Sequence, residues 1–223
     1  MRVACLFSGG KDSSFAAYKA FKEGHEIRAL VTLVPKHAES YMFHYPNLQL
    51  TPLQAKLMRF PHVMVDTEGE KEKELVDLRL AISRVEGIEG VVSGALASVY
   101  QKKRVDAVCQ ELGLESIAPL WKRDPETNLR EELAEGFEVI FTGIAADGLD
   151  ESWLGRKLDE DAIRDLKRLH KKYGIHIGGE GGEFESFVLN CPLFDKPIRV
   201  KKAHRVMESP NRGFYEIEEV ETG

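Results

Sequence analysis

The chain has 223 residues, of which 43% are hydrophobic and 30% charged, as expected of a soluble protein with one large domain or one medium-sized and one small domain. Its net charge of −6 argues against binding nucleic acid over a broad surface, so no stable nucleic-acid partner is expected. No apolar run reaches about 18 residues and no signal-peptide pattern follows Met1, which predicts a cytoplasmic protein with no membrane partner.

The first predicted element is a strand over Arg2–Phe7, followed by Ser-Gly-Gly-Lys-Asp-Ser at 8–13 and a helix over Ser13–Lys22. Two adjacent glycines allow a tight turn and a close approach of the backbone to a ligand. The amides of the turn and of the first helical residues would then converge at the positive end of the helix dipole. The segment is a candidate phosphate-binding loop, and the alternative is an ordinary strand–helix junction capped by Ser8 or Asp12.

Spacing excludes two common phosphate loops. A Walker A loop needs glycine where Cys5 stands and Ser or Thr where Asp12 stands. The dinucleotide fingerprint G-x-G-x-x-G is also absent from this segment. The segment instead resembles the PP-loop, S-G-G-x-D-S, of the ATP pyrophosphatases, which split ATP between its α and β phosphates.

The PP-loop resemblance implies ATP as cofactor and assigns nucleotide binding to the whole segment: Ser8, Gly9, Gly10, Lys11, Asp12 and Ser13. Its amides and the two serine hydroxyls would hold the leaving pyrophosphate. Lys11 would neutralise phosphate charge or be merely solvated. Asp12, as a catalytic residue, would help to hold Mg²⁺ or fix the turn.

Strands and helices continue to alternate up to about residue 120. Strands are predicted over Ile27–Leu33, His62–Val65, Gly90–Val92 and Ser116–Ala118, and helices over Thr51–Phe60, Glu70–Val85 and Val99–Leu112. This alternation predicts a parallel sheet with right-handed crossovers, whose ligands bind beyond the carboxyl ends of the strands. Thr32 and Leu33, which close the second predicted strand, are expected to contact adenine through the backbone, by analogy of fold. Thr51-Pro52-Leu53-Gln54 has the pattern of a capping box.

The polar segment 122–127 predicts a boundary between a PP-loop nucleotide-binding domain over 1–123 and a C-terminal substrate-binding domain over 124–223. The second part should contain a short helix, a strand over Val139–Thr142 and a helix over Glu160–Tyr173. The buried face of that helix is expected to comprise Ile163, Leu166, Leu169 and Tyr173. Extended runs from Phe184 predict antiparallel strands. The predicted fold class is α/β, with a Rossmann-like parallel sheet and a smaller C-terminal α/β domain.

The glycine–glutamate segment, residues 178–186, contains four glycines and three glutamates. Its composition is as compatible with a mobile acidic surface loop as with a loop that aims carboxylates into a cleft. The segment resembles the motif that follows the PP-loop domain in the diphthine–ammonia ligases. Further matching blocks extend that resemblance, to the short archaeal type of the family, over nearly the whole chain: Ser93–Ala95, Ser98–Gln101 with Arg104, Leu120–Arg123 and Gly148–Gly155.

This second resemblance implies the amidation of diphthine on translation elongation factor 2 by ammonium, in which ATP adenylates the carboxylate, pyrophosphate leaves and ammonia displaces AMP. It implies catalytic roles for Glu183 and Glu185, which with Tyr100 or Trp153 would also contact the quaternary ammonium of diphthine. The expected substrate-binding residues are Ser93, Gly94, Tyr100, Gln101, Arg104, Asp147, Gly181, Gly182, Glu183, Glu185 and Ser186. Asp147 and Asp150 either line the same cleft or cap a turn.

The cysteine contexts predict the nitrogen donor. A glutaminase needs a cysteine nucleophile, either N-terminal or in a sharp glycine-flanked turn, whereas Cys5, Cys109 and Cys191 have the pattern of scattered core thiols. Free ammonium is therefore the expected donor. The dispersed histidines lack the spacing of metal ligands. The sequence does not determine the oligomeric state, and a homo-oligomer is one possibility.

Two rival functions remain at this stage. A PP-loop enzyme that adenylates a tRNA base would share the nucleotide site, although paired cysteines for thiolation are absent and the net charge is acidic. A non-catalytic ATP-binding regulator would use the same sheet without chemistry. Measuring pyrophosphate release separates the three functions. A regulator releases none, a tRNA-modifying enzyme needs RNA, and the ligase needs modified elongation factor and ammonium.

Overall fold

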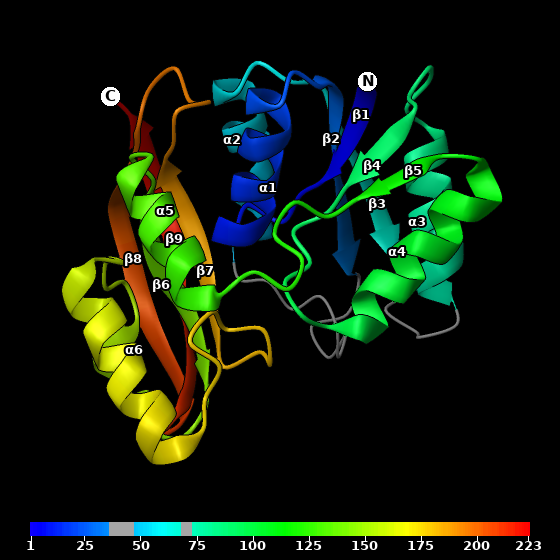
Figure 1. Cartoon of the computed structure of the whole chain (residues 1–223). Helices are drawn as coiled ribbons and strands as arrows, with labels where there is room; N and C mark the ends of the chain where they lie inside the picture. Colours follow the sequence, from blue (N-terminus) through cyan, green and yellow to red (C-terminus); the bar gives the residue numbers. More distant parts are fainter. Residues whose placement is uncertain (36–46, 68–72) are drawn as a thin grey trace. The chain divides into compact units, whose positions relative to one another are not determined.

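The computed structural model of the protein describes residues 1–35, 47–67 and 73–223. The chain divides into two compact units, Met1–Trp121 and Lys122–Gly223, with their elements labelled in Figure 1. Within the described ranges, none of the helices has both the length and the apolar character needed to cross a bilayer.

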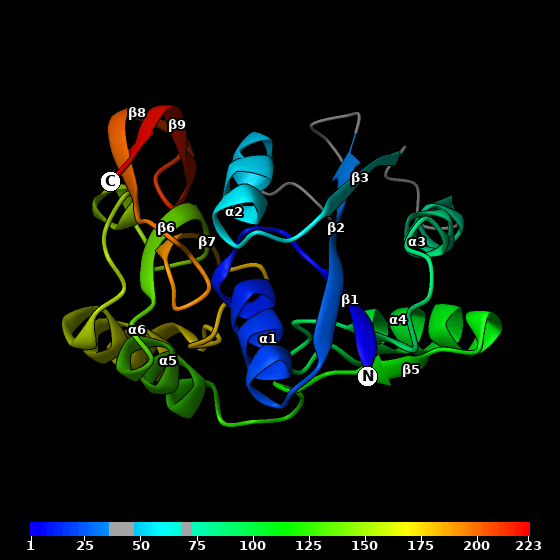
Figure 2. The same ribbon diagram turned by 90° about the horizontal axis from the view of Figure 1, so that it is seen from above.

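The first unit is built on a five-stranded parallel sheet in the order β3-β2-β1-β4-β5. Its strands are β1 (Arg2–Leu6), β2 (Glu26–Pro35), β3 (His62–Thr67), β4 (Gly90–Val92) and β5 (Glu115–Ile117). Its helices are α1 (Lys11–Lys22), the 3₁₀ turn η1 (Leu48–Leu50), α2 (Thr51–Leu57), α3 (Lys73–Ser83) and α4 (Val99–Leu112). Helices α1 and α2 lie on one face of the sheet and α3 and α4 on the other (Figure 2), which is the expected Rossmann-like arrangement.

One core cluster of this unit joins α3, β4 and α4. Leu78 and Ile82 of α3 pack with Val91, Val105 and Val108 in one core cluster. The predicted helix Glu70–Val85 ends earlier, at Ser83, and its residues 70–72 lie outside the described residues. The helix over Val99–Leu112 is confirmed at both ends, because Ser98 caps its start and Gly113, at φ +67°, ends it.

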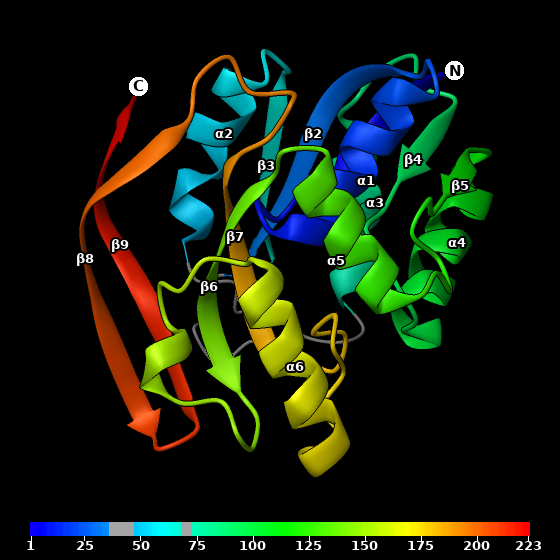
Figure 3. The ribbon, with the colours of Figure 1, turned by 60° about the vertical axis from the view of Figure 1, so that its left-hand side comes forward.

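The second unit contains an antiparallel sheet in the order β7-β6-β9-β8. Its elements are α5 (Pro125–Ala134), β6 (Glu138–Ala145), the 3₁₀ turn η2 (Glu151–Trp153), α6 (Glu160–Tyr173), β7 (Phe184–Asn190), β8 (Ile198–Ser209) and β9 (Arg212–Thr222). Helices α5 and α6 both cover one face of this sheet, as Figures 2 and 3 show. The expected antiparallel strands and the overall fold class are confirmed.

One prediction about α6 is wrong. Ile163 and Leu166 are fully buried, but Tyr173, expected on the same buried face, is 44% exposed. Its ring lies against Gly148, where an added Cβ would come within 2.5 Å of a ring carbon. Tyr173 is the last helical residue, so it covers a neighbouring turn instead of entering the core.

Candidate functional site

The turn between β1 and α1 has the geometry of an anion site. Gly9 has φ +79°, a conformation that favours glycine, and Gly10 precedes the first helical residue. Among the described residues no side chain caps the start of α1, so the alternative of a junction capped by Ser8 or Asp12 is wrong. The first intrahelical bond runs from the Ser14 amide to the Gly10 carbonyl, at 3.1 Å. The amides of the first turn therefore point away from the helix body, toward whatever occupies the loop.

The two serines of the loop hold its shape by bonding to each other. The Ser8 and Ser13 hydroxyl oxygens are 3.1 Å apart, and the Ser8 amide donates to the Ser13 hydroxyl over 3.2 Å. The Ser13 hydroxyl also donates to the Gly10 carbonyl over 3.1 Å. This ring of bonds ties both ends of the turn together, so the amides are ordered before any ligand arrives.

Gln54 is a residue of this site that the sequence analysis missed. Its side chain is fully buried and its Nε2 donates to the Gly9 carbonyl over 3.1 Å. A Cβ on Gly9 would come within 2.3 Å of the Gln54 Oε1, which is a second reason for glycine there. The expected capping box is wrong: the Thr51 hydroxyl donates backward to the Leu48 carbonyl, and Gln54 supports the loop instead.

Lys11 and Asp12 form an ion pair within the loop. The Lys11 Nζ lies 2.6 Å from an Asp12 carboxylate oxygen, and the side chains are 3% and 30% exposed, respectively. The reading of Lys11 as merely solvated is wrong, because its side chain is buried. Asp12 is one carboxylate with its charge already balanced, and the described residues contain no cluster of three or more metal-ligating groups. These residues do not fit a Mg²⁺ ion held by the protein alone.

The second strand places a backbone edge beside the loop. β2 extends to Pro35 because its pairing with β3 continues to Thr67, so Thr32 and Leu33 lie inside the strand and do not close it. The Val31 carbonyl accepts from the Phe7 amide, whereas the Leu30 amide donates toward β3. Backbone groups alternate in direction along a strand. The amide and carbonyl of Leu33 therefore point to the β1 side, past the end of β1.

Thr32 has a different task from that of Leu33. Its side chain is buried, and its hydroxyl donates to the Phe7 carbonyl over 2.7 Å. The same oxygen lies 2.8 Å from Nε2 of His62. Because the hydroxyl has only one proton, Nε2 of His62 is the donor in this second contact. Burial lowers the pKa of His62 below its ordinary value of 6.5.

Ser93 and Gly94 lie at the carboxyl end of β4, the neighbour of β1 in the sheet. A Cβ on Gly94 would lie 2.8 Å from the Asp12 carbonyl carbon and 2.8 Å from the Ser13 nitrogen, which are both backbone atoms. Gly94 is thus required for close packing against the first turn of α1. The Ser93 side chain is 5% exposed, and its hydroxyl has no hydrogen-bond partner among the described residues.

Tyr100, Gln101 and Arg104 lie in the first turns of α4. The Arg104 guanidinium donates to the Tyr100 hydroxyl and lies 5.1 Å from the centroid of its ring. A second cation on this ring would meet the charge of Arg104, so Tyr100 is a poor partner for a quaternary ammonium. Trp153 is also a poor partner, because it is 4% exposed and the guanidinium carbon of Arg156 lies 4.4 Å from the centroid of its ring.

The second unit holds the remaining predicted residues. The Glu183 carboxylate accepts from the amides of His176 and Gly181, each over 2.8 Å. Glu185 pairs with Gly143 of β6, whose missing Cβ leaves room for the Glu185 side chain at 3.0 Å. Successive side chains in a strand point to opposite faces, so Glu185 and Ser186 do not line one surface.

The two aspartates near β6 have structural partners. Asp147 accepts from the side-chain Nδ2 of Asn211 over 2.6 Å, which links it to the β8–β9 turn. Asp150 caps η2 by accepting from the Ser152 amide over 2.9 Å. Of the two open readings, the turn-capping one holds for Asp150.

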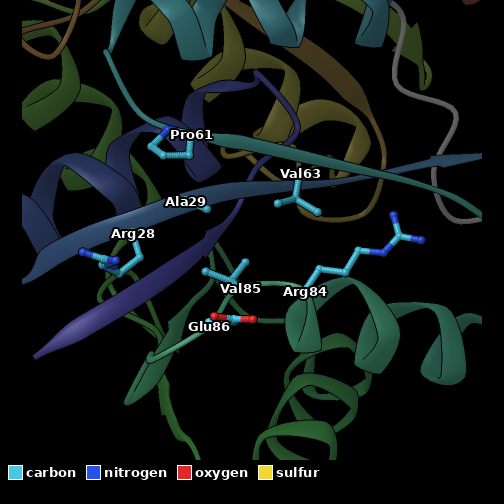
Figure 4. Close-up of a pocket in the computed structure, with 7 residues that line it drawn as sticks. All are labelled: Arg28, Ala29, Pro61, Val63, Arg84, Val85 and Glu86. Atoms are coloured by element: carbon cyan, nitrogen blue, oxygen red, sulfur yellow. The ribbon is translucent and has the colours of Figure 1, made fainter.

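A shallow depression of about 310 Å³ in the first unit does not belong to this site. It lies between the start of β3, the first half of β2 and the segment after α3, and Arg28 and Arg84 flank it. Figure 4 shows these two arginines pointing away from each other. They do not converge on a single anion.

Both parts of the chain match known protein families. Residues 1–116 match the diphthamide synthase N-terminal domain, and residues 124–222 match the diphthamide synthase C-terminal domain. The chain is 39% identical to the diphthine–ammonia ligase of Rattus norvegicus over 94% of this chain and 86% of that protein. It is 37% identical to the diphthine–ammonia ligase of Homo sapiens, with the same coverage.

Two further matches are more limited. The diphthine–ammonia ligase of Schizosaccharomyces pombe is 36% identical over 89% of this chain but only 36% of that longer protein. A crystal structure of a predicted subunit of tRNA methyltransferase from Methanocaldococcus jannaschii covers 86% of this chain and 98% of that chain, at 18% identity and a TM-score of 0.46. That likeness is too distant to bear on function.

Proposed function

The chain belongs to the diphthamide synthase family, and from this premise we propose that it is a diphthine–ammonia ligase that forms AMP and pyrophosphate from ATP. It is thus a ligase that forms a carbon–nitrogen bond. The observation that carries the proposal is the uncapped, amide-lined turn at Ser8–Ser13 in a chain that matches this family in both parts.

The turn is proposed to hold the two outer phosphates of ATP. The amides at the start of α1 would balance the charge of the departing pyrophosphate. The bonds from Ser8, Ser13 and Gln54 support this role, because they order the turn before ATP binds. The backbone of Leu33 would meet the adenine edge, since its amide and carbonyl point past the end of β1.

The chemistry proceeds in two balanced steps. A carboxylate oxygen of diphthine attacks the α phosphorus, an acyl–adenylate bond forms, and the bond to the bridging oxygen breaks as pyrophosphate leaves. Ammonia then attacks the acyl carbon, AMP leaves with the electrons of the broken carbon–oxygen bond, and the amide nitrogen loses its extra proton. A carboxylate alone resists ammonia because oxide is a very poor leaving group, so activation and positioning are the main demands on the protein.

Ammonium itself is the proposed nitrogen donor. Burial raises the pKa of the Cys5 thiol to about 12, of Cys109 to about 11 and of Cys191 to about 12. All three cysteines are buried, so none offers the exposed thiolate that a glutaminase needs.

Substrate binding is proposed for residues of both units. In the first unit, Arg104 would pair with a phosphate or carboxylate oxygen beside Tyr100 and Gln101, and the Ser93 hydroxyl would donate to the nucleotide or its adduct. In the second unit, Glu185 is the proposed carboxylate for the cationic substrate. Asp147, Gly181 and Gly182 are proposed to shape the surface around it.

Mg²⁺ is proposed to enter as the counterion of ATP and not through a site built by protein carboxylates. The ion would balance the charge of the triphosphate. The Lys11–Asp12 pair supports this view, because it leaves the Asp12 carboxylate already neutralised. The natural partner would be elongation factor 2 bearing diphthine, in the cytoplasm.

The test measures pyrophosphate release and diphthamide formation by the purified chain. We expect both products with ATP, ammonium and diphthine-bearing elongation factor 2. Neither should form without the factor, and no diphthamide should form without ammonium. Orthophosphate in place of pyrophosphate, or a requirement for RNA, would contradict the proposal. Amidation with glutamine as the sole nitrogen source would contradict the ammonium assignment alone.

A further inference from the structure

The loop from His176 to Glu183 turns its backbone amides inward. The His176 amide donates to Glu183 Oε1 and the Gly181 amide to Glu183 Oε2, each over 2.8 Å. The amides of Gly178 and Glu180 both donate to Nδ1 of His176, over 3.1 Å and 3.3 Å. Two further backbone hydrogen bonds lie within the loop. The Gly179 amide donates to the His176 carbonyl, and the Gly182 amide donates to the Gly179 carbonyl.

Two side chains thus account for four of these amide bonds. Nδ1 of His176 accepts twice, so it has no proton, and Nε2 is the protonated ring nitrogen of the neutral ring. Glu183 accepts through both carboxylate oxygens. We call this pair of side chains the His176–Glu183 clasp.

The clasp gives this loop the opposite polarity to the turn at Ser8–Ser13. In a trans peptide the N–H and the preceding C=O point in opposite directions, and the described residues contain no cis peptide bond. The inward amides of Gly181 and Gly182 therefore turn the carbonyls of Glu180 and Gly181 outward. Gly181, which carries one of these carbonyls, is exposed, and Glu180, which carries the other, is partly buried.

We infer that His176 is a positioning residue that, with Glu183, makes this glycine-rich loop a surface of oxygen atoms for the cationic group of the substrate. This inference rests on the proposed function and names the part of the substrate that the loop meets. The chemical class is a quaternary ammonium, which is attracted by carbonyl and carboxylate oxygens and cannot donate a conventional hydrogen bond. Glu183 acts here through the loop backbone, in place of the catalytic role expected from the sequence.

The experiment compares His176→Asn, His176→Gln and His176→Ala. The Asn amide oxygen can reach the position of Nδ1, whereas Gln places its oxygen further from the backbone and Ala has no acceptor. Amide hydrogen exchange at Gly178 and Glu180 is measured first, since it does not depend on activity. Faster exchange is expected for the Ala and Gln variants, with recovery in the Asn variant.

Kinetics then test what the loop binds. The Ala and Gln variants should raise KM for diphthine-bearing elongation factor about tenfold, corresponding to about 1.4 kcal/mol, within the range for two lost hydrogen bonds. KM for ATP should stay the same. Tetramethylammonium chloride should compete with the factor in the wild type at least tenfold better than in the Ala variant, whereas potassium phosphate should not compete at this loop.

Two control variants keep the experiment decisive. His204→Ala removes an exposed histidine of the same unit, which pairs with Glu216 and Glu218 on the β8–β9 hairpin, and it should change none of these readouts. Glu183→Gln serves as the second variant if His176→Ala fails to fold. It keeps one acceptor oxygen, so hydrogen exchange should become faster at the amide of His176 or of Gly181.

The inference is wrong if exchange at Gly178 and Glu180 is the same in His176→Ala as in the wild type. It is also wrong if the Asn variant is no better than the Gln variant, or if tetramethylammonium inhibits the Ala variant and the wild type equally. A wild-type chain that does not amidate at all would refute the proposed function, while the exchange data would still decide the role of the clasp.

Discussion

Replacing Gly94 by alanine should damage nucleotide binding without any contact between the new methyl group and the nucleotide. The added Cβ would lie 2.8 Å from the Asp12 carbonyl carbon and the Ser13 nitrogen, whereas ordinary contacts begin at 3.4 Å. The first turn of α1 must therefore retreat by about 0.6 Å, because backbone atoms cannot rotate away as a flexible side chain can. A displacement of this size moves the amides that are proposed to hold the outer phosphates.

Two magnitudes follow for Gly94→Ala. Overpacking of this kind typically costs about 1–3 kcal/mol of unfolding free energy. Misplacing a binding group by about 1 Å can cost a factor of about 100, so we expect the Kd for ATP to rise at least tenfold. Urea unfolding measures the first quantity, and titration with ATP followed by calorimetry measures the second.

Gly90→Ala is the matched control for Gly94→Ala. Gly90 begins the same strand, β4, and a Cβ there would lie 3.0 Å from the Glu115 carbonyl oxygen. We expect a comparable or smaller loss of stability and an unchanged Kd for ATP, since the contact is at the other end of the strand. If Gly94→Ala binds ATP as tightly as the wild type, or if both variants weaken ATP binding equally, the reasoning from close approach is refuted.

Three further predictions concern the same unit or the cysteines. Gln54→Leu should lower the unfolding free energy by about 1–3 kcal/mol and weaken ATP binding, because the Gly9 carbonyl loses its buried donor; equal ATP affinity by calorimetry would show that this bond is not needed. Because burial lowers the pKa of His62 in the folded state, the unfolded chain binds more protons below pH 6.5, so the unfolding free energy should fall as the pH drops below 6.5 toward the folded-state pKa. His62→Asn should flatten that pH dependence in urea titrations between pH 5 and 8, and an unchanged slope would argue against His62 as its source. The three buried cysteines should resist a thiol reagent at pH 8 in the native protein and all react in urea, so fast labelling without denaturant would count against their role as core thiols.

Local signals predicted much of the fold. The bounds of α4 and α6 follow from their caps, because Ser98 and Asp159 accept from the first turn and Gly113 and Gly174 end the helices in the left-handed region. The C-terminal end of β2 could not be predicted from such local signals. Its last residues are strand only because β3 pairs with them, and that partner lies about 30 residues further along the chain.

The sequence by itself determined the turn at Ser8–Ser13, because two glycines between an apolar strand and a helix need no distant partner to produce an amide-lined loop. It also determined the parallel order of strands and helices in the first unit. Only the tertiary structure decided that Gln54 supports Gly9 across 45 residues, that Gly94 packs on the backbone of Asp12, and that Glu183 bonds to the His176 amide. The physical reason is that these contacts join segments far apart in the chain or depend on the direction of single peptide groups. Residue type and spacing determine neither property.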